Sequence, residues 1–199
     1  MAVAGIVGGA TSSALGGDFA AGAFSASFAR LFNDEKKGHG LNEDAQKGRQ
    51  AQRRAQRNVS VSTSVDEATG EHLYQIRGRI CSTSSSACNQ ALADRVFGRV
   101  NANDIPFTSD NLGSGERLLL GRDPIHHSEN IAGRTSINTT LPGHTFHPGT
   151  VTHQVHFENG NLYYDVTGRG SGSLPGFNNF VGKELFQPNV VRTVRDFGF

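Results

Sequence analysis

The stretch TVTHQVHFENGNLYYDVT, residues 150–167, decides the fold class of this chain. Polar and apolar residues alternate on both sides of the Asn159-Gly160 pair, and an Asn-Gly pair between two such segments is the strongest short-range signal for a β-hairpin. Because successive side chains of a strand point to opposite faces, His153 and His156 are expected on different faces of the sheet.

A second β-hairpin is predicted nearer the N-terminus. Valines alternate with polar residues over residues 59–65, the sequence DEATG at residues 66–70 has the composition of a turn, and residues 72–80 form the returning strand. Residues 131–140 predict one more strand. Together these segments indicate an antiparallel sheet of about four to six strands.

Helices are expected to cover this sheet. Residues 87–100 place apolar side chains on one helical face, with Ser85 or Ser86 as the N-cap. Residues 178–186 predict a short helix that stops before Pro188, since proline lacks the backbone N–H that continues a helix. With the helices on one side of the sheet, the predicted fold class is α+β.

Two stretches are predicted to be irregular, residues 101–123 and residues 168–176. The second has the sequence GRGSGSLPG and is interpreted as a flexible turn. The alternative is that its glycines let the backbone approach a phosphate, with Arg169 over it.

Composition divides the chain into three parts. Residues 1–33 are rich in glycine and alanine and predict a poorly packed tail, residues 34–58 form a basic linker, and residues 59–199 hold one domain. The linker is interpreted as solvated, with the alternative that it steers the domain to nucleic-acid phosphates. The formal net charge is +1, so overall charge indicates neither a nucleic-acid nor a membrane partner.

The chain has only two cysteines, Cys81 and Cys88, and is therefore not a disulfide scaffold. Two reduced thiols are expected for a domain that acts in a cytoplasm. The alternative is a single bridge that closes a short loop. It is not the preferred expectation, because a disulfide across so short a loop must meet a restrictive geometry.

Histidines give the strongest chemical signal. Six of the eight lie between residues 126 and 156, and histidine is the usual general acid or base near neutral pH. His144 and His147 flank a Thr-Phe pair in the turn LPGHTFHPG, where two imidazoles converge more easily than on a strand. They are the predicted catalytic pair.

These residues fit cleavage of RNA without a metal ion. The reaction needs a base for the 2′-hydroxyl, an acid for the leaving oxygen and a cation for the phosphorane. The predicted catalytic set is His144, His147, Arg134, Arg169 and Thr167. The predicted substrate-binding set is His153, Lys183, Tyr164 and Asn178. The neighbouring carboxylates lack the spacing of a metal site, so neither a metal nor a cofactor is expected.

Two stretches resemble the C-terminal region of Rhs-repeat and filamentous-haemagglutinin-like polymorphic toxins of bacteria. The run GGATSSALGGDFAAGAFSASFARLFN resembles their pre-toxin segment, and the match is carried by Gly16, Gly17, Phe19, Gly22, Ala23, Phe32 and Asn33. The run NTTLPGHTFHPGTVTHQVHFENGNLYYDVTGRGSG is similar to a toxin module of the same proteins. The residues that match its motif are His144, His147, Pro148, Gly149, Thr167, Gly168, Gly170, Gly172 and Asn178.

The resemblance implies a class of protein rather than a reaction. A polymorphic toxin is secreted by its producer, acts in the cytoplasm of a target cell, belongs to a larger parent chain and is blocked by a cognate immunity protein. No secretion signal is visible in the first residues, so any export address is expected elsewhere. RNA is the expected substrate.

Two other functions stay open at this point. In an ADP-ribosyltransferase toxin, Arg77 would hold NAD and Glu158 would be the catalytic carboxylate, although no Glu-x-Glu or Gln-x-Glu pair is present. A membrane-active toxin that is not an enzyme would use residues 1–33, whose apolar run is short and interrupted by polar residues.

Overall fold

The computed structural model describes residues 43–103, 113–119, 123–171 and 175–199. The chain divides into two compact units, Met1–Arg49 and Gln50–Phe199. The predicted Gly/Ala-rich tail, residues 1–33, lies outside the described residues. The division falls within helix α3 (Glu43–Arg57) and within the predicted basic linker, so residues 50–58 belong to the second unit.

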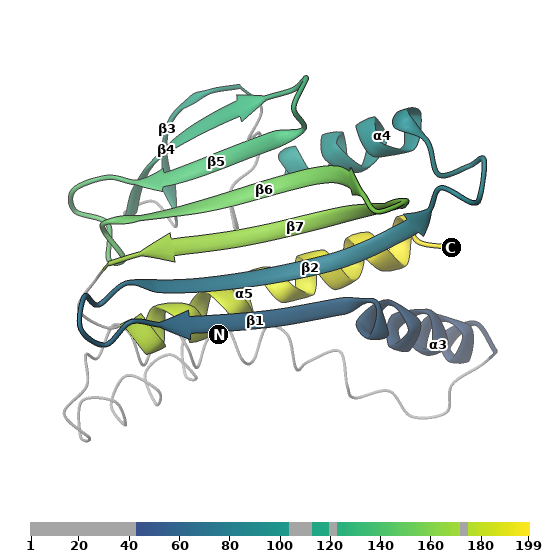
Figure 1. Cartoon of the computed structure of the whole chain (residues 1–199), viewed down its shortest axis with the longest axis horizontal. Coiled ribbons are helices and arrows are strands. Elements are labelled where there is room, and N and C mark those ends of the chain that lie inside the picture. Colours follow the sequence, from purple (N-terminus) through teal and green to yellow (C-terminus); the bar gives the residue numbers. More distant parts are fainter. Residues whose placement is uncertain (1–42, 104–112, 120–122, 172–174) are drawn as a thin grey trace. The chain divides into compact units, whose positions relative to one another are not determined.

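The second unit is built on one antiparallel sheet of seven strands, in the order β1-β2-β7-β6-β5-β4-β3 (Figure 1). The strands are β1 (Val59–Val65), β2 (His72–Ser82), β3 (Gly115–Leu119), β4 (Asp123–Asn130), β5 (Thr135–Thr140), β6 (Gly149–Glu158) and β7 (Asn161–Gly170). Both predicted hairpins are present, as β1–β2 and β6–β7. The predicted α+β class is confirmed, with a larger sheet than expected.

The additional strands are β3, which comes from sequence that predicts a loop, and β4, where no strand is predicted. Strand β3 and the first residue of β4 lie within residues 101–123, and β5 begins at Thr135 rather than at Ile131. Ile131 lies in the turn before β5, where Arg134 adopts a φ of 48°. Strand formation here depends on pairing with neighbouring strands, which overrides a weak local propensity.

The N-cap predicted for the helix at residues 87–100 is wrong. Helix α4 (Gln90–Asn101) begins after Asn89, whose side chain accepts a hydrogen bond from the Leu92 N–H at 3.1 Å. An asparagine at this position satisfies an N–H that the helix itself leaves unbonded.

The C-terminal helix is longer than predicted. Helix α5 (Pro175–Phe197) continues through Pro188, with buried Leu185 and Phe186 before it and Val190 and Val191 after it. Burial of this apolar face against β1, β2 and β7 offsets the backbone hydrogen bond that proline removes. No described helix is both long enough and apolar enough to cross a membrane.

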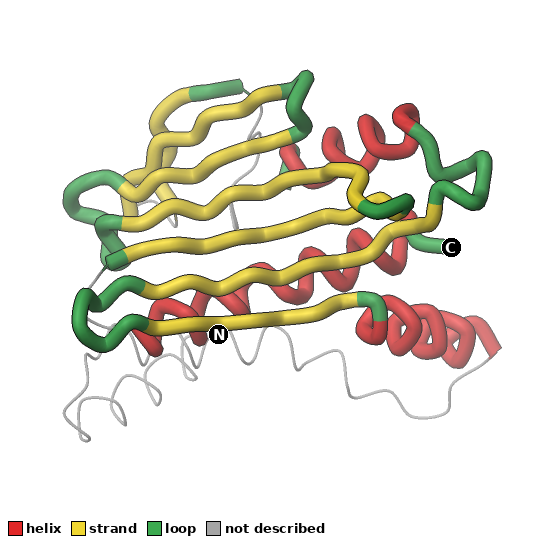
Figure 2. Tube along the Cα trace, in the orientation of Figure 1, coloured by secondary structure: helices red, strands yellow, loops and turns green. Residues whose placement is uncertain are grey.

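Both α4 and α5 cover one face of the sheet, called the inner face below. Helix α4 packs on β6 and contacts α5, which runs behind β2 and β1 in Figure 2. The core lies between the helices and the buried side chains of the inner face, which include Tyr74, Ile76, Val155, Tyr164 and Val166. In the part of the chain that the structure describes, no helix covers the opposite, outer face.

Glycines at the end of β7 have a packing role. The predicted turn at residues 168–176 is instead strand as far as Gly170. A Cβ on Gly168 would lie 2.1 Å from the Tyr74 ring, and a Cβ on Gly170 would lie 2.6 Å from the His72 ring. Both positions therefore need glycine because inner-face rings of the adjacent strand β2 lie directly against the backbone.

Cys81 and Cys88 form a disulfide, with a Cα–Cα distance of 5.8 Å. The expectation of two reduced thiols is therefore wrong. The bridge ties the end of β2 to the connection that leads into α4, and both cysteines are buried.

Candidate functional site

The predicted catalytic pair lies in the β5–β6 connection, but the two imidazoles have different surroundings. His144 is only 9% exposed, and its Nδ1 accepts a hydrogen bond from the Phe146 N–H at 2.9 Å. Burial lowers its pKa, Asp123 raises it, and His147 lowers it again. A buried imidazole with one nitrogen already bonded is poorly placed to exchange a proton with a substrate.

His147 is exposed, and its Nδ1 lies 3.0 Å from the Thr140 carbonyl oxygen. Since a carbonyl only accepts, Nδ1 carries the proton and Nε2 of the neutral ring is an acceptor. His147 lines a groove of about 660 Å³ together with His72 and Arg169. We call this the sheet-end groove, since its walls come from the β1–β2 turn, the β5–β6 connection and the end of β7.

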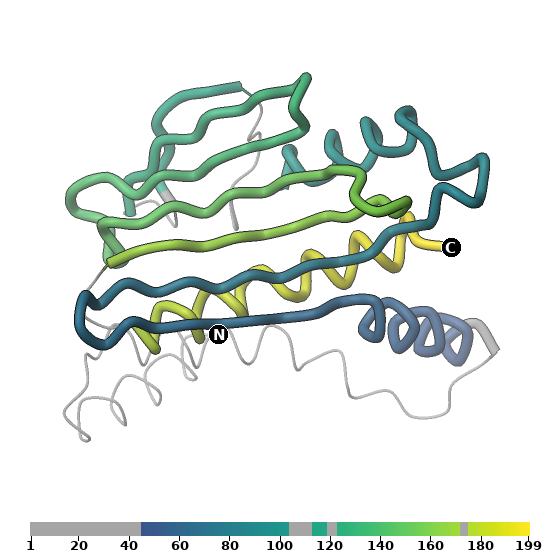
Figure 3. The backbone as a smooth tube through the Cα atoms, viewed as in Figure 1, coloured from purple at the N-terminus to yellow at the C-terminus, as the bar shows by residue number. Residues whose placement is uncertain are grey.

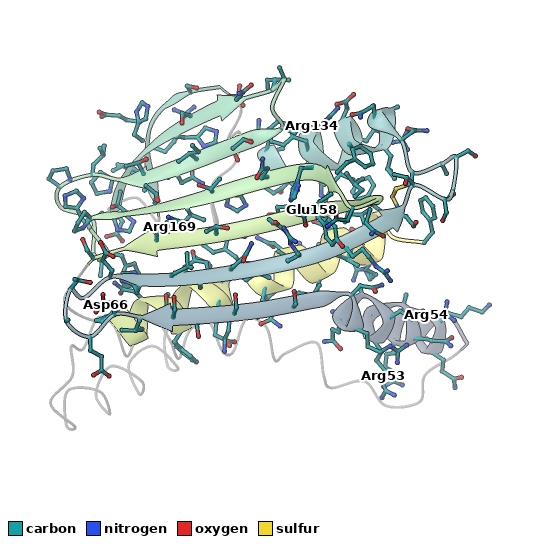
Figure 4. The ribbon with its side chains drawn as sticks, in the orientation of Figure 1. Arg53, Arg54, Asp66, Arg134, Glu158 and Arg169 are labelled. Atoms are coloured by element: carbon teal, nitrogen blue, oxygen red, sulfur yellow. A yellow bond between two sulfur atoms is a disulfide. The ribbon has the colours of Figure 1, made fainter. Side chains whose placement is uncertain are left out.

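Arg134 does not reach this groove. It lies in the β4–β5 turn at the opposite end of the sheet, as its label and that of Arg169 show in Figure 4. Its Nε donates to Asp94 Oδ1 at 2.7 Å, and its Nη2 donates to Gln90 Oε1 at 2.7 Å. The structure thus brings His147 and Arg169 to one groove and separates Arg134 from them. Thr167 lies on the outer face, paired with Thr152.

The predicted substrate-binding residues do not gather at one surface. His153 and Tyr164 are buried on the inner face, and His153 Nδ1 lies 2.8 Å from the Tyr164 hydroxyl. Asn178 is buried on α5. Lys183, also on α5, contacts Glu184 at 3.2 Å and lies 5.5 Å from the centre of the Phe180 ring.

A different group of side chains meets on the outer face. Arg77 of β2 donates from Nε to Asp165 Oδ1 at 3.0 Å, from Nη2 to Asp165 Oδ2 at 2.7 Å and from Nη1 to Glu158 Oε2 at 2.6 Å. His156 Nε2 lies 3.1 Å from Asp165 Oδ2. Arg77, His156, Glu158, Asp165 and Tyr163 are called the outer-face cluster below.

Local strand geometry explains how this cluster forms. His156 and Glu158 are two residues apart on β6, so both point to the outer face, and Tyr163 is the direct partner of His156 across the hairpin. The pairing of β2 with β7 places Arg77 directly opposite Asp165. The prediction that His153 and His156 point to opposite faces is confirmed.

The electrostatics of the cluster centre on Arg77. The hydrogen bonds that Arg77 donates to Asp165 raise its pKa most, burial lowers it, and the charge of Asp165 and the contact with Glu158 raise it further. The guanidinium carbon also lies 4.7 Å from the centre of the Tyr163 ring. Arg77 is therefore a fixed cation, held by a carboxylate that is only 8% exposed.

The exposed end of the cluster borders open space. Glu158 is 42% exposed at its side chain and lines a hollow of about 390 Å³. Other walls of this hollow come from the β6–β7 turn and the start of α4, including Asn159, Gly160 and Gln90. A ligand at the outer face can therefore approach Glu158 and Arg77 from solvent.

Two residues of the outer-face cluster are also candidates from the sequence. Arg77 and Glu158 were the pair expected for an ADP-ribosyltransferase, and the fold does bring them into contact. The two groups form an ion pair with each other, and Asp165 occupies the other edge of the guanidinium. The alternation around Asn159-Gly160 was a signal that His156, Glu158, Tyr163 and Asp165 share one face. Among the described residues, no group of three or more His, Cys, Asp or Glu is arranged to hold a metal ion.

No family model matches the chain, and no curated protein matches it. Solved structures resemble it distantly. CalU16 from Micromonospora echinospora is 12% identical to this chain, with a TM-score of 0.40. The match covers 70% of this chain and 93% of CalU16. Human STARD10 is 11% identical, with a TM-score of 0.36, and the match covers 70% of this chain and 68% of STARD10. Ara h 8.0201 is 10% identical, with a TM-score of 0.36, and the match covers 64% of this chain and 97% of Ara h 8.0201. Similarity at this level assigns no function to the chain.

Proposed function

We propose that this chain is the toxin domain of a polymorphic toxin and that it cleaves RNA at the outer-face cluster. One observation carries the proposal: a carboxylate, a guanidinium and an imidazole-carboxylate pair lie in contact on a sheet face that no described helix covers. These are the base, the cation and the acid that cleavage of a phosphodiester without a metal ion requires.

Each residue has a separate part in the proposed reaction. Glu158 accepts the proton of the ribose 2′-hydroxyl, and the 2′-oxygen then attacks phosphorus. The bond from phosphorus to the 5′-oxygen breaks as protonated His156 gives its proton to that oxygen. The products are a 2′,3′-cyclic phosphate and a 5′-hydroxyl. Glu158 has gained one proton and His156 has lost one, so the protons balance.

Arg77 stabilises the additional negative charge on the phosphorane. Its Nη1 contacts Glu158, and an arriving phosphate competes for that edge and frees the carboxylate to act as a base. Asp165 is a positioning residue, because it holds the other edge of Arg77 and also Nε2 of His156. With Nε2 directed at Asp165, the atom of His156 that faces the substrate is Nδ1.

The test is cleavage of a labelled single-stranded RNA by the purified full chain in the presence of EDTA, with the new ends analysed for 2′,3′-cyclic phosphate. We expect His156→Ala and Glu158→Gln each to lower kcat/KM by about 10²- to 10⁴-fold. Arg77→Ala is expected to lower it by about 10²- to 10³-fold.

Two control variants match these changes on the same molecule. His126 and Glu116 are exposed on strands β4 and β3, away from the cluster. His126→Ala and Glu116→Gln should therefore leave cleavage unchanged. Intact RNA with the wild-type chain, or full cleavage by both His156→Ala and Glu158→Gln, would overturn the proposal.

The toxin role has its own readout. Expression of the chain in a bacterial cytoplasm should arrest growth, and the Glu158→Gln variant should relieve the arrest if RNA cleavage is its cause. A cognate immunity protein is proposed as the natural inhibitor, since a producer must block its own toxin. Arrest that persists unchanged with the Glu158→Gln variant would contradict a toxic role for this reaction.

A further inference from the structure

The sheet-end groove lies on the same sheet as the outer-face cluster but at the end of the strands. Arg169 is four residues beyond Asp165 on β7, which is about 13 Å along the strand at about 3.3 Å per residue. Both residues belong to the outer face, because they are an even number of positions apart. One short RNA segment that lies along β7 can therefore contact both places.

The groove has one basic wall. Arg169 is exposed at its edge. Among the described residues, no ion pair engages its guanidinium, in contrast to Arg77 and Arg134. His147 lies in the same wall, with Nδ1 held by the Thr140 carbonyl, so that Nε2 remains for a ligand. A phosphate is the anion that the Arg169 guanidinium would attract, and His147 would donate to it from Nε2 when its imidazole carries a second proton.

His72 adds an observation independent of charge. It lines the groove, is 8% exposed, and its buried Nδ1 has no hydrogen-bond partner. Gly170 makes room for its ring, since a Cβ there would lie 2.8 Å from Nε2. A buried polar atom without a partner costs free energy. The His72 ring belongs to the inner face, so His72 enters the inference only as a residue that lines the groove.

The opposite wall of the groove is acidic. It contains Asp66 and Glu71 from the β1–β2 turn. The side chain of Asp66 accepts hydrogen bonds from the N–H groups of Ala68 and Thr69, which fixes the carboxylate at the edge of the groove. Carboxylates repel a phosphate but accept hydrogen bonds from sugar hydroxyls and from the N–H groups of a base. The two walls together therefore match a molecule with an anionic end and a donor-rich end.

We infer that the sheet-end groove binds a nucleotide of the RNA that flanks the scissile bond, with its phosphate at Arg169 and His147 and its sugar or base toward Asp66 and Glu71. The volume of about 660 Å³ is in the range of small-molecule sites. The inference rests on the proposed cleavage of RNA for its biological meaning, but binding at the groove can be measured alone.

The direct test is calorimetric titration of the full chain with AMP, GMP, CMP and UMP, and separately with inorganic phosphate. We expect at least one nucleotide to bind more tightly than phosphate. Arg169→Ala should weaken that binding about tenfold, and His147→Ala should weaken it in the same direction. Arg95→Ala is the matched control, because Arg95 is an exposed arginine on α4 outside the groove.

Kinetics separate this inference from the proposed function. The ratio of kcat/KM for a longer single-stranded oligonucleotide to that for a dinucleotide should fall about tenfold in Arg169→Ala and stay constant in Arg95→Ala. Nucleotide binding that depends on Arg169 in a chain that cleaves no RNA would support the groove and overturn the proposed reaction. Cleavage of RNA with no nucleotide binding, or with equal binding by both arginine variants, would overturn the groove.

Discussion

Arg77 and Asp165 lie directly opposite each other on adjacent strands, and the guanidinium donates hydrogen bonds from both Nε and Nη2 to the carboxylate. The two residues are 88 positions apart in the sequence. A bidentate pair of this kind fixes the orientation of the arginine as well as its charge. It leaves Nη1 directed toward Glu158, which is the arrangement on which the proposed reaction depends.

The first prediction concerns the stability that this pair contributes. Asp165→Asn should lower the free energy of unfolding by about 1–3 kcal/mol, because a nearly buried carboxylate is lost while Arg77 remains partly exposed. Asp94→Asn removes a pair with Arg134 in which the aspartate is 65% exposed, and should cost at most about 1 kcal/mol. Urea unfolding of both variants checks the difference, and equal losses would contradict it.

The second prediction concerns the dependence of stability on pH. Burial, and after it the charge of His127, lowers the pKa of His153 to about 3 in the folded chain. An unfolded histidine has a pKa of about 6.5, so protons bind preferentially to the unfolded chain between these values. The stability is therefore complete above about pH 6.5 and falls by about 1.4 kcal/mol per pH unit as the pH decreases toward 3.

Urea unfolding at several pH values tests this dependence. His153→Gln should flatten the slope, whereas His126→Gln should keep it, because His126 is exposed. Burial also lowers the pKa of His144, which adds to the slope in the same direction. An unchanged slope in His153→Gln would show that His153 is not the group responsible.

The third prediction concerns the glycines of the last strand. In Gly168→Ala the new methyl group would lie 2.1 Å from the Tyr74 ring, which is buried and cannot move without disturbing the core. We expect a loss of about 1–3 kcal/mol. Gly98→Ala in α4 meets no atom within 4 Å and should stabilise the chain by up to about 1 kcal/mol. Thermal unfolding of the two variants should shift in opposite directions.

The fourth prediction concerns the disulfide. Cys81 and Cys88 close a short loop, so the bridge should stabilise the folded chain by about 2 kcal/mol through its effect on the unfolded state. The double variant Cys81→Ser and Cys88→Ser should lower Tm by roughly 4–8 °C. The same shift should follow addition of a reductant to the wild-type chain, and a reductant should not affect the variant further.

Several features of the fold could be predicted from local sequence. The Asn-Gly turn and the alternation around it specified the β6–β7 hairpin, and the same alternation placed His153 and His156 on opposite faces. The β1–β2 hairpin was equally clear. In contrast, β3 and β4 have little strand propensity of their own, and α5 continues through Pro188 because the sheet buries the apolar residues on both sides of it.

The candidate site could be predicted only in part. The window rich in histidine contains His156, but its spacing favours the turn that holds His144 and His147. Burial of His144 and the distance of Arg134 from that turn could not be deduced from spacing, because both depend on where the strands lie in the sheet. The path of the chain in Figure 3 shows the reason, since segments from distant parts of the sequence become neighbours.

The sequence by itself determined the two hairpins and the face to which each of their side chains points, because a period of two residues is a local property of a strand. Only the tertiary structure decided which strands pair. The partnership of β2 with β7 joins one hairpin to the other and sets Arg77 against Asp165. Backbone hydrogen bonds are alike at every position, so the choice of register depends on burial of the inner face as a whole rather than on any short motif.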